Sequence, residues 1–245
     1  ARGVVPSLLE FLDQASLRAT NDYRSMGLPD HAAAMLIARS DAGGQRADSD
    51  IATIAEVFSQ VGGFDIIEAE DAAEGELLLA ARRDNHFALE HIGARTGRNA
   101  RLVDDICVPL TRLAELVESV EKVSDEVGLP VMTVGHAGDG NMHPNVLFDP
   151  DDPDEVRRAR EAFDRIMRIG LALGGTITGE HGVGRLKREW LEQELGPVGL
   201  RVHQELRRVL DPAGILNPGK VLRPAGSPAS AVPSEASSEV PDFTN

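Results

Sequence analysis

Cysteine is nearly absent from this sequence, because Cys107 is the only one in 245 residues. A single cysteine excludes a disulfide within the chain, and it fits a reducing compartment such as the cytoplasm. Cys107 lies in the apolar run 102–109, where a small buried hydrophobe is a better interpretation than a nucleophile. Aromatic residues are also scarce, at 4% against 42% hydrophobic residues in total, so we expect an aliphatic core.

The chain also lacks positive charge and long apolar runs. It has 25 Lys and Arg against 40 Asp and Glu, for a formal net charge of −15, which argues against binding to nucleic acids or anionic lipids. No apolar run approaches the roughly 18 residues of a membrane span, and no secretory signal is present. We therefore expect a cytoplasmic protein, with peripheral attachment to a membrane left open. Because the chain begins with Ala and an amphipathic segment follows at once, it is interpreted as a piece of a longer protein.

Apolar periodicity predicts alternating helices and strands over residues 1–222. Helices are expected at 7–25, 48–61, 74–90, 113–127 and 153–173, and in a segment ending near residue 210. Strands are expected at 34–38, 64–69, 102–108, 131–134 and 145–148. Two strand-helix-strand passes indicate an α+β fold with a ferredoxin-like antiparallel sheet, helices on one face and further C-terminal helices. Residues 223–245, rich in Pro, Ser and Ala, are predicted to form a disordered tail.

The first motif that carries chemistry is Gly-His-Ala-Gly-Asp-Gly-Asn-Met-His-Pro at 135–144. His136 directly follows a predicted strand, and His143 stands seven residues later, so a tight glycine turn can bring the two imidazoles together. Asn145 lies two residues beyond His143 and shares its side of a strand. Asp139 is a competing acidic candidate, but its glycine neighbours favour a role in the turn.

The second motif is Gly-Gly-Thr-Ile-Thr-Gly-Glu-His-Gly at 174–182. Neighbouring side chains project in different directions, so Glu180 and His181 are expected to divide two tasks. A hard carboxylate suits Glu180 to bind a divalent metal together with His136 and His143. An imidazole that titrates near neutral pH suits His181 to act as a base.

The remaining candidates have simpler explanations. His31, His86, His91 and His203 are treated as incidental. Asn217 lies in Asp-Pro-Ala-Gly-Ile-Leu-Asn-Pro-Gly-Lys at 211–220, and the following proline is expected to hold it in extended backbone, from which its amide can point at a ligand. The spacing of that segment by itself favours a structural turn.

Taken together, the motifs resemble the C-terminal domain of FAD-linked oxidases of the vanillyl-alcohol-oxidase type. The nearest branch is similar to D-lactate dehydrogenase, glycolate oxidase and D-2-hydroxyglutarate dehydrogenase. Three segments in the right order carry the resemblance, which covers residues 6–222: the motif at 135–144, Gly-Glu-His-Gly-Val-Gly at 179–184 and Ile-Leu-Asn-Pro-Gly-Lys at 215–220.

The resemblance implies flavin-dependent oxidation of a small 2-hydroxy acid to a 2-oxo acid. The residues that match a divalent-metal site for zinc, iron or manganese are His136, His143 and Glu180. His181 matches the base that takes the hydroxyl proton, and Asn145 matches a residue that contacts substrate or metal. Arg82 falls where relatives bind the substrate carboxylate, and Asn217 falls near the flavin ring.

The sequence departs from this family pattern in several places, one of which is the stretch 93–101, longer and more basic than a minimal connection. The domain that mainly holds FAD is absent from this chain, so the isolated chain is expected to be inactive. Arg83 stands beside Arg82 and competes for its assignment, and the chain has Val103 and Asp104-Asp105 where some relatives have Lys. Two other functions remain open: a metal-dependent hydrolase that uses the same residues, and a non-catalytic subunit that pairs with a separate FAD-carrying chain.

Overall fold

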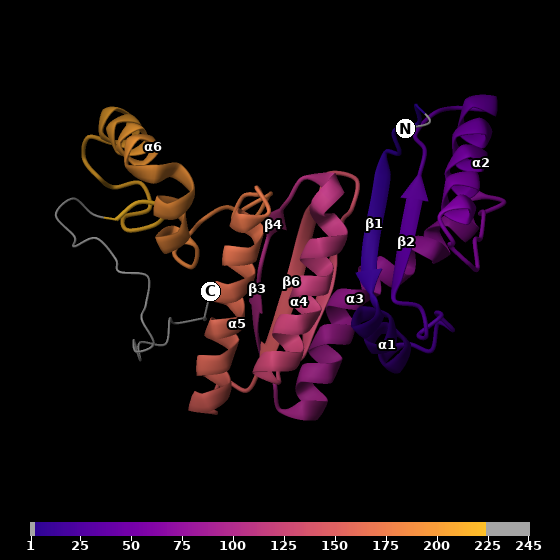
Figure 1. The fold of residues 1–245 in the computed structure, drawn as a ribbon, viewed down its shortest axis with the longest axis horizontal. Coiled ribbons are helices and arrows are strands. Elements are labelled where there is room, and N and C mark those ends of the chain that lie inside the picture. The colour runs from indigo at the N-terminus through magenta and orange to yellow at the C-terminus, as the bar shows by residue number, and fades with distance from the viewer. Residues whose placement is uncertain (1–2, 224–245) are drawn as a thin grey trace. The chain divides into compact units, whose positions relative to one another are not determined.

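The computed structural model describes residues 3–223, and it divides into two compact units at the peptide bond between Glu180 and His181. The first unit holds an antiparallel sheet in the order β2-β1-β5-β6-β3, in which β4 also pairs with β6 (Figure 1). Its strands are β1 (Leu8–Asp13), β2 (Ala34–Arg39), β3 (Ala100–Val103), β4 (Ile106–Cys107), β5 (Val131–His136) and β6 (Asn141–Phe148). Its helices are α1 (Gln14–Tyr23), α2 (Gln45–Gln60), α3 (Ala72–Thr96), α4 (Leu113–Val127) and α5 (Pro153–Ala172), with a short 3-10 turn η1 (Leu110–Arg112) before α4. The predicted α+β class with an antiparallel sheet is confirmed.

The centre of the sheet is the hairpin of β5 and β6, which pair antiparallel as predicted. Every residue of β6 is buried, because β5 and β3 flank it and helices cover it. The turn between the two strands ends at Gly140, whose φ of +80° is strained for any side chain, and a Cβ there would lie 2.1 Å from the Val108 carbonyl oxygen. Asp139 accepts a hydrogen bond from the Asn141 N–H in this turn, in line with its predicted role.

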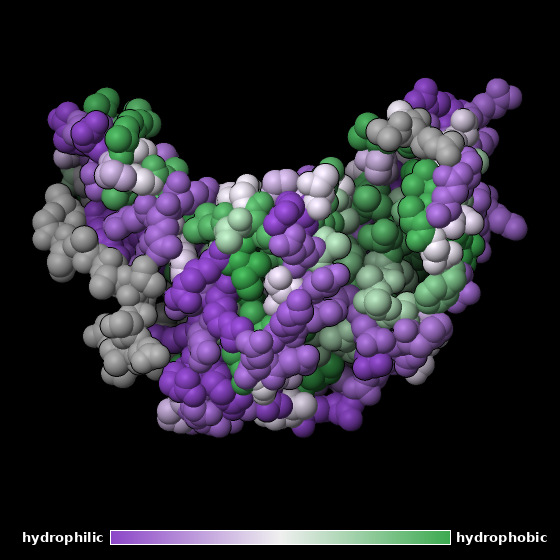
Figure 2. All heavy atoms as spheres, in the orientation of Figure 1, coloured by the Kyte–Doolittle hydropathy of each residue, from purple (hydrophilic) through white to green (hydrophobic). Residues whose placement is uncertain are grey.

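The helices, expected on one face, pack on both faces of the sheet. Met132 and Leu147 point to one face and form a core cluster with residues of α1 and α3. Ile106 and Met142 point to the other face, where a Cβ on Gly170 of α5 would touch the Ile106 side chain. On that side α4 and α5 lie against each other and against the sheet (Figure 1). In Figure 2 hydrophilic residues dominate their outer surface.

Residues 7–25, predicted as one helix, divide into a strand and a helix. The apolar run at the start of the segment pairs with β2 on one side and β5 on the other, and this pairing overrides helical periodicity. Asp13 ends the strand and caps α1, because its carboxylate accepts from the Ser16 N–H at 2.7 Å. The same carboxylate accepts from the Thr133 N–H of β5, so the cap also joins two strands.

Two other predicted strands also differ from the structure. Residues 64–69 form no strand; Asp65 has a φ of +50°, and the Ile67 side chain is exposed. The expected strand 102–108 is divided into β3 and β4 by Asp104 and Asp105, whose side chains are fully buried. A buried carboxylate is costly without polar partners, and that of Asp105 accepts from Thr178 Oγ1 and the Gly179 N–H.

The second unit begins at His181 and contains α6 (Arg188–Leu210), which is interrupted at Gly196 before Pro197. After α6, Asp211 accepts hydrogen bonds from the Ile215 and Leu216 N–H groups and forms a tight turn. Asn217 has a φ of +44°, so its backbone is left-handed rather than extended as expected; asparagine tolerates this conformation better than most residues. The predicted tail lies outside the described residues apart from Arg223. Among the described helices, none combines the length and the apolar character of a membrane span.

Candidate metal centre

The two histidines of the first motif lie on neighbouring strands and point to the same side of the sheet. His136 ends β5 and His143 lies in β6, where it pairs with Val134. Because Val134 and His136 are two residues apart on one strand, their side chains share a face with His143. The imidazole ring centroids are 5.3 Å apart and the rings meet edge to face, at 83°. The hairpin therefore brings together the pair that the glycine-rich motif predicted.

Glu180 completes this arrangement from a loop that follows α5. Its Oε1 atom lies 3.1 Å from His136 Nε2 and 3.1 Å from His143 Nε2. The His143 side chain is 7% exposed, whereas those of His136 and Glu180 are 35% and 52% exposed. The three groups thus converge at a point that is buried on the side of β6 and open to solvent on the side of Glu180.

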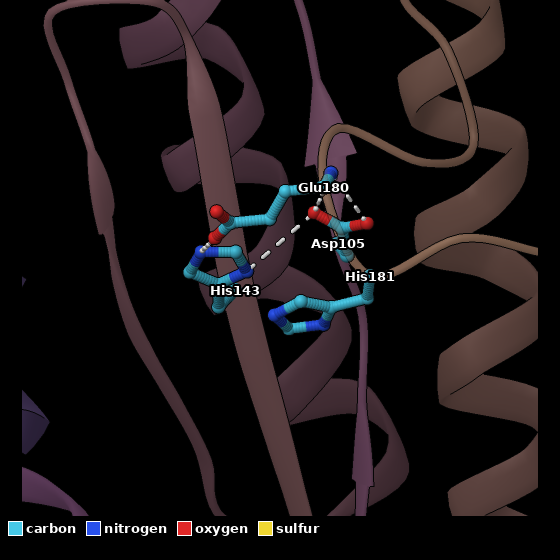
Figure 3. Close-up of side chains that lie close together, drawn as sticks. All are labelled: Asp105, His143, Glu180 and His181. Carbon is cyan, nitrogen blue, oxygen red and sulfur yellow. Dashed lines mark hydrogen bonds and ion pairs between the residues drawn. The ribbon is translucent and has the colours of Figure 1, made fainter.

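Asp105 holds the loop that carries Glu180. Its buried carboxylate accepts from Thr178 Oγ1 at 2.7 Å, from the Gly179 N–H at 3.0 Å and from the Glu180 N–H at 3.1 Å. The carboxylate also lies 3.8 Å from His143 Nδ1. One ligand-type atom from each of Asp105, His143 and Glu180 lies within 4.8 Å of the others (Figure 3). Asp105 was not among the predicted site residues, although two acids inside an apolar run are a signal in the sequence.

Glu10 is a second residue that the sequence analysis missed. It pairs with His136 across β1 and β5, and its Oε1 lies 2.7 Å from His136 Nδ1. Its Oε2 accepts from Arg82 Nε of α3 at 2.8 Å. The signal in the sequence is one acid among the leucines and phenylalanine of 8–12. Arg83 instead pairs with the exposed Glu76, so α3 points Arg82 toward the histidines and Arg83 away from Glu10.

The charges around His136 set its protonation. Partial burial of the ring disfavours the charged form, but the hydrogen bond with Glu10 and the negative charges of Glu10 and Glu180 favour it more. These carboxylates therefore raise the pKa of His136 above its ordinary value, against a smaller opposing effect of Arg82.

Asn145 lies on the same face as His143, as expected, but its amide group is turned into the sheet. Nδ2 donates to the His143 carbonyl oxygen at 2.7 Å and to the Met132 carbonyl oxygen at 3.3 Å. This side chain therefore fixes the backbone that presents His143. Cys107 lies nearby in β4, and its thiol donates to the Asp139 carbonyl oxygen of the hairpin turn at 3.2 Å.

The other predicted site residues belong to the second unit. His181 follows Glu180 directly, and the peptide bond between them is the boundary of the two units (Figure 3). The Asn217 carbonyl oxygen accepts from the Lys220 N–H in the turn after α6. Among the histidines treated as incidental, His203 donates from Nδ1 to the Gly199 carbonyl oxygen of its own helix.

The donor set fits a divalent metal. Ligands of a small ion with bonds of about 2.0–2.2 Å lie roughly 3.3 Å from one another in a tetrahedral arrangement, close to the separation between each Nε2 and Glu180 Oε1. Asp105 is less suited to ligation, because both its oxygens already accept backbone or hydroxyl hydrogen bonds. Two imidazoles and one carboxylate, with the carboxylate of Glu10 at the second ring nitrogen of His136, form a recurrent arrangement of metal sites.

Known proteins are similar to this chain in sequence. The family described as "FAD linked oxidases, C-terminal domain" matches residues 1–221. Glycolate oxidase subunit GlcD of Bacillus subtilis (strain 168) is 35% identical over 222 residues, which are 91% of this chain and 46% of that protein. The probable mitochondrial D-lactate dehydrogenase of Danio rerio is 34% identical over 222 residues, or 90% of this chain and 43% of that protein.

Two solved structures share the fold at low identity. The 4-ethylphenol oxidase from Gulosibacter chungangensis superposes with a TM-score of 0.61 at 16% identity, over 88% of this chain and 47% of that one. The p-cresol methylhydroxylase gives a TM-score of 0.62 at 17% identity, over 87% and 46%. The chain spans about half the length of the curated relatives it matches. On the strength of the family match over residues 1–221, the chain belongs to the FAD-linked oxidase C-terminal domains.

Proposed function

We propose that this chain is the substrate- and metal-binding domain of an FAD-dependent dehydrogenase or oxidase that converts a 2-hydroxy acid to a 2-oxo acid. The observation that carries the proposal is the approach of His136 Nε2 and His143 Nε2 to the same oxygen of Glu180, each at 3.1 Å. The names of the relatives, glycolate oxidase and D-lactate dehydrogenase, supply the substrate class.

In this proposal His136, His143 and Glu180 bind the divalent ion. Two imidazole nitrogens and one carboxylate oxygen suit zinc, and they suit iron or manganese as well. The bound metal would lower the pKa of the substrate hydroxyl, and the flavin would accept the hydride. Because the Glu180 side chain is half exposed, a small substrate can reach the centre from its side.

Arg82 binds the substrate carboxylate in this proposal. Its Nε is held by Glu10, which leaves the terminal nitrogens of the guanidinium group as donors for a second carboxylate. The side chain is 23% exposed, so it is partly desolvated and its attraction for an anion is stronger than that of a surface arginine. Glu10 fixes the direction of this cation relative to His136.

His181 is proposed to accept the hydroxyl proton of the substrate. As the residue after a metal ligand, it lies near the ion by connectivity, while neighbouring side chains point in different directions and leave it outside the ligand set. An imidazole nitrogen can accept the proton of an alcohol as a general base. Asn145 acts by fixing the His143 backbone, and Asn217 is assigned to the flavin side of the site by resemblance alone.

Metal binding can be tested on the chain itself. Titration with Zn²⁺ or Mn²⁺, followed by calorimetry, should show one tight site that is lost in His143→Ala. The matched control is His203→Ala, since His203 is a histidine of α6 whose Nδ1 hydrogen-bonds within its own helix, to the Gly199 carbonyl oxygen. Equal metal affinity in the wild type and in His143→Ala would contradict the proposed centre.

Turnover is tested on the full-length protein with its FAD. A panel of 2-hydroxy acids that includes glycolate and D-lactate should reduce the flavin, and His181→Ala should abolish this reduction while the metal content stays unchanged. Retained flavin reduction in His181→Ala would remove the proposed base. If the FAD-binding part is encoded as a separate chain, reduction will require both chains together, which corresponds to the alternative of a paired subunit.

A further inference from the structure

Glu10 is a buried acid at a position where the strand pattern calls for an apolar residue. It is 7% exposed, and both neighbours on its side of β1, Leu8 and Leu12, belong to an apolar core cluster or pack against it. Removing a carboxylate from water is costly unless polar partners compensate for the lost hydration. A buried acid in β1, which has a strand on each side, therefore requires polar partners that compensate for its lost hydration.

Each oxygen of Glu10 has a different partner. Oε1 lies 2.7 Å from His136 Nδ1, and Oε2 lies 2.8 Å from Arg82 Nε. His136 is 126 residues away in sequence and Arg82 is 72 residues away, so only the folded sheet and α3 create this arrangement. One carboxylate thus joins a residue of the proposed metal centre to the proposed binder of the substrate carboxylate.

We infer that Glu10 is a positioning residue that orients both His136 and Arg82 for the function proposed above, on which this inference rests. A carboxylate accepts hydrogen bonds only, so it selects the neutral imidazole form that carries its proton on Nδ1. The lone pair of that form is on Nε2, the nitrogen that faces Glu180. Glu10 therefore presents His136 as a metal ligand in the required tautomer.

The same carboxylate fixes the arginine. Because Oε2 takes the Nε–H, the guanidinium plane is held at its stem while its terminal nitrogens stay available to an anion. The two effects act together: the distance between the metal ligand and the cation is fixed by one side chain. Binding of the metal and recognition of the substrate carboxylate are coupled through Glu10.

Two variants distinguish a positioning role of Glu10 from a purely structural ion pair. Glu10→Gln keeps the size of the side chain, but it replaces one acceptor oxygen by a donor NH2 group, so it cannot reproduce both the Oε1 contact with His136 and the Oε2 contact with Arg82. Glu76→Gln is the matched control, because Glu76 lies on α3, pairs with Arg83 and is 59% exposed. Urea unfolding of both variants measures the structural contribution separately.

The readouts are zinc affinity and the tautomer of His136 in the metal-free chain. Zinc affinity of Glu10→Gln should fall by about 10–100-fold, while that of Glu76→Gln should stay within twofold of the wild type. ¹⁵N NMR at alkaline pH, where the ring is neutral, should show the Nδ1–H form in the wild type and a mixture in Glu10→Gln. The His136 signals are identified by their loss in His136→Gln.

The outcomes separate this inference from the proposed function. Unchanged zinc affinity and an unchanged His136 tautomer in Glu10→Gln would overturn the inference, even if His143→Ala abolishes zinc binding. Absence of zinc binding by the wild type would instead overturn the metal centre. The tautomer measurement would still test whether Glu10 orients His136, because it is made without metal.

Discussion

The two halves of the candidate centre are held in very different ways. His136 and His143 lie on β5 and β6, the central hairpin of the sheet, where strands pair with them on both sides. Glu180 lies in a loop, and its backbone N–H is held by the single carboxylate of Asp105. Strand pairing fixes the histidines through many hydrogen bonds, whereas one buried side chain accepts the backbone N–H of Glu180.

This difference predicts that substitutions in the Glu180 loop alter the candidate centre without unfolding the protein. Local opening of a protein is easiest where few buried contacts hold a segment. Substitutions in the hairpin should therefore reduce global stability and metal binding together. Substitutions at the loop should affect metal binding more than stability.

The largest expected effect comes from Asp105→Ala. Loss of the carboxylate leaves the Thr178 hydroxyl and the Gly179 and Glu180 N–H groups without their acceptor, and the cost is about 3 kcal/mol or more. Urea unfolding measures this loss, and zinc titration should show that the metal site is lost with it. Asp105→Asn keeps one acceptor oxygen and should have an intermediate effect; wild-type zinc affinity in Asp105→Ala would show that the loop holds Glu180 by other means.

A pair of glycine substitutions compares the two regions directly. In Gly135→Ala the new Cβ would lie 2.4 Å from the Asn141 carbonyl oxygen and 2.8 Å from the Met142 Cα, which are backbone atoms of β6. The strands would have to separate, so we expect a loss of about 2–3 kcal/mol in the free energy of unfolding.

In Gly179→Ala the new Cβ would lie 2.5 Å from atoms of the Asn141 side-chain amide, which can rotate. Its stability should fall by less, about 1 kcal/mol, while zinc affinity falls because Glu180 is displaced. Thermal unfolding and zinc titration of both variants test the contrast. Equal losses of stability would mean that the loop is as rigid as the hairpin.

The smallest expected effect concerns an ion pair remote from the centre, and it depends on pH. Arg98 makes two hydrogen bonds to the carboxylate of Glu155, and this pairing lowers the pKa of Glu155 below its ordinary value, against a smaller effect of burial. An acid with a lowered folded-state pKa stabilises the fold above its unfolded pKa, and this stabilisation is lost as the pH falls through the folded-state pKa.

Glu155→Gln should therefore reduce stability by about 1 kcal/mol at neutral pH and by little in strong acid. Urea unfolding at both pH values measures the difference, and zinc affinity at neutral pH should stay at the wild-type level. If the stability difference between Glu155→Gln and the wild type does not change with pH, the charge of Glu155 does not contribute to the free energy of unfolding, and its effect comes from packing and hydrogen-bond geometry.

Local patterns in the sequence predicted the parts of this molecule that depend on local chemistry. The glycine turn between His136 and His143 and the proline start of α5 are examples, because each depends on residues a few positions apart. The residues that were missed act over long distances. Glu10 meets His136 across 126 positions and Asp105 meets Glu180 across 75, and no local pattern contains such pairings. The same reason explains β1, whose strand pairing overrode a helical pattern.

The environment of Cys107 affects how readily its thiol is oxidised. Burial, followed by the negative charges of Asp139 and Asp105, raises the pKa of the Cys107 thiol. Peroxide attacks the thiolate form, so this sulfur should resist conversion to sulfenic acid. Asp139 and Asp105 thereby disfavour oxidation of a thiol whose hydrogen bond reaches the hairpin turn of the candidate centre.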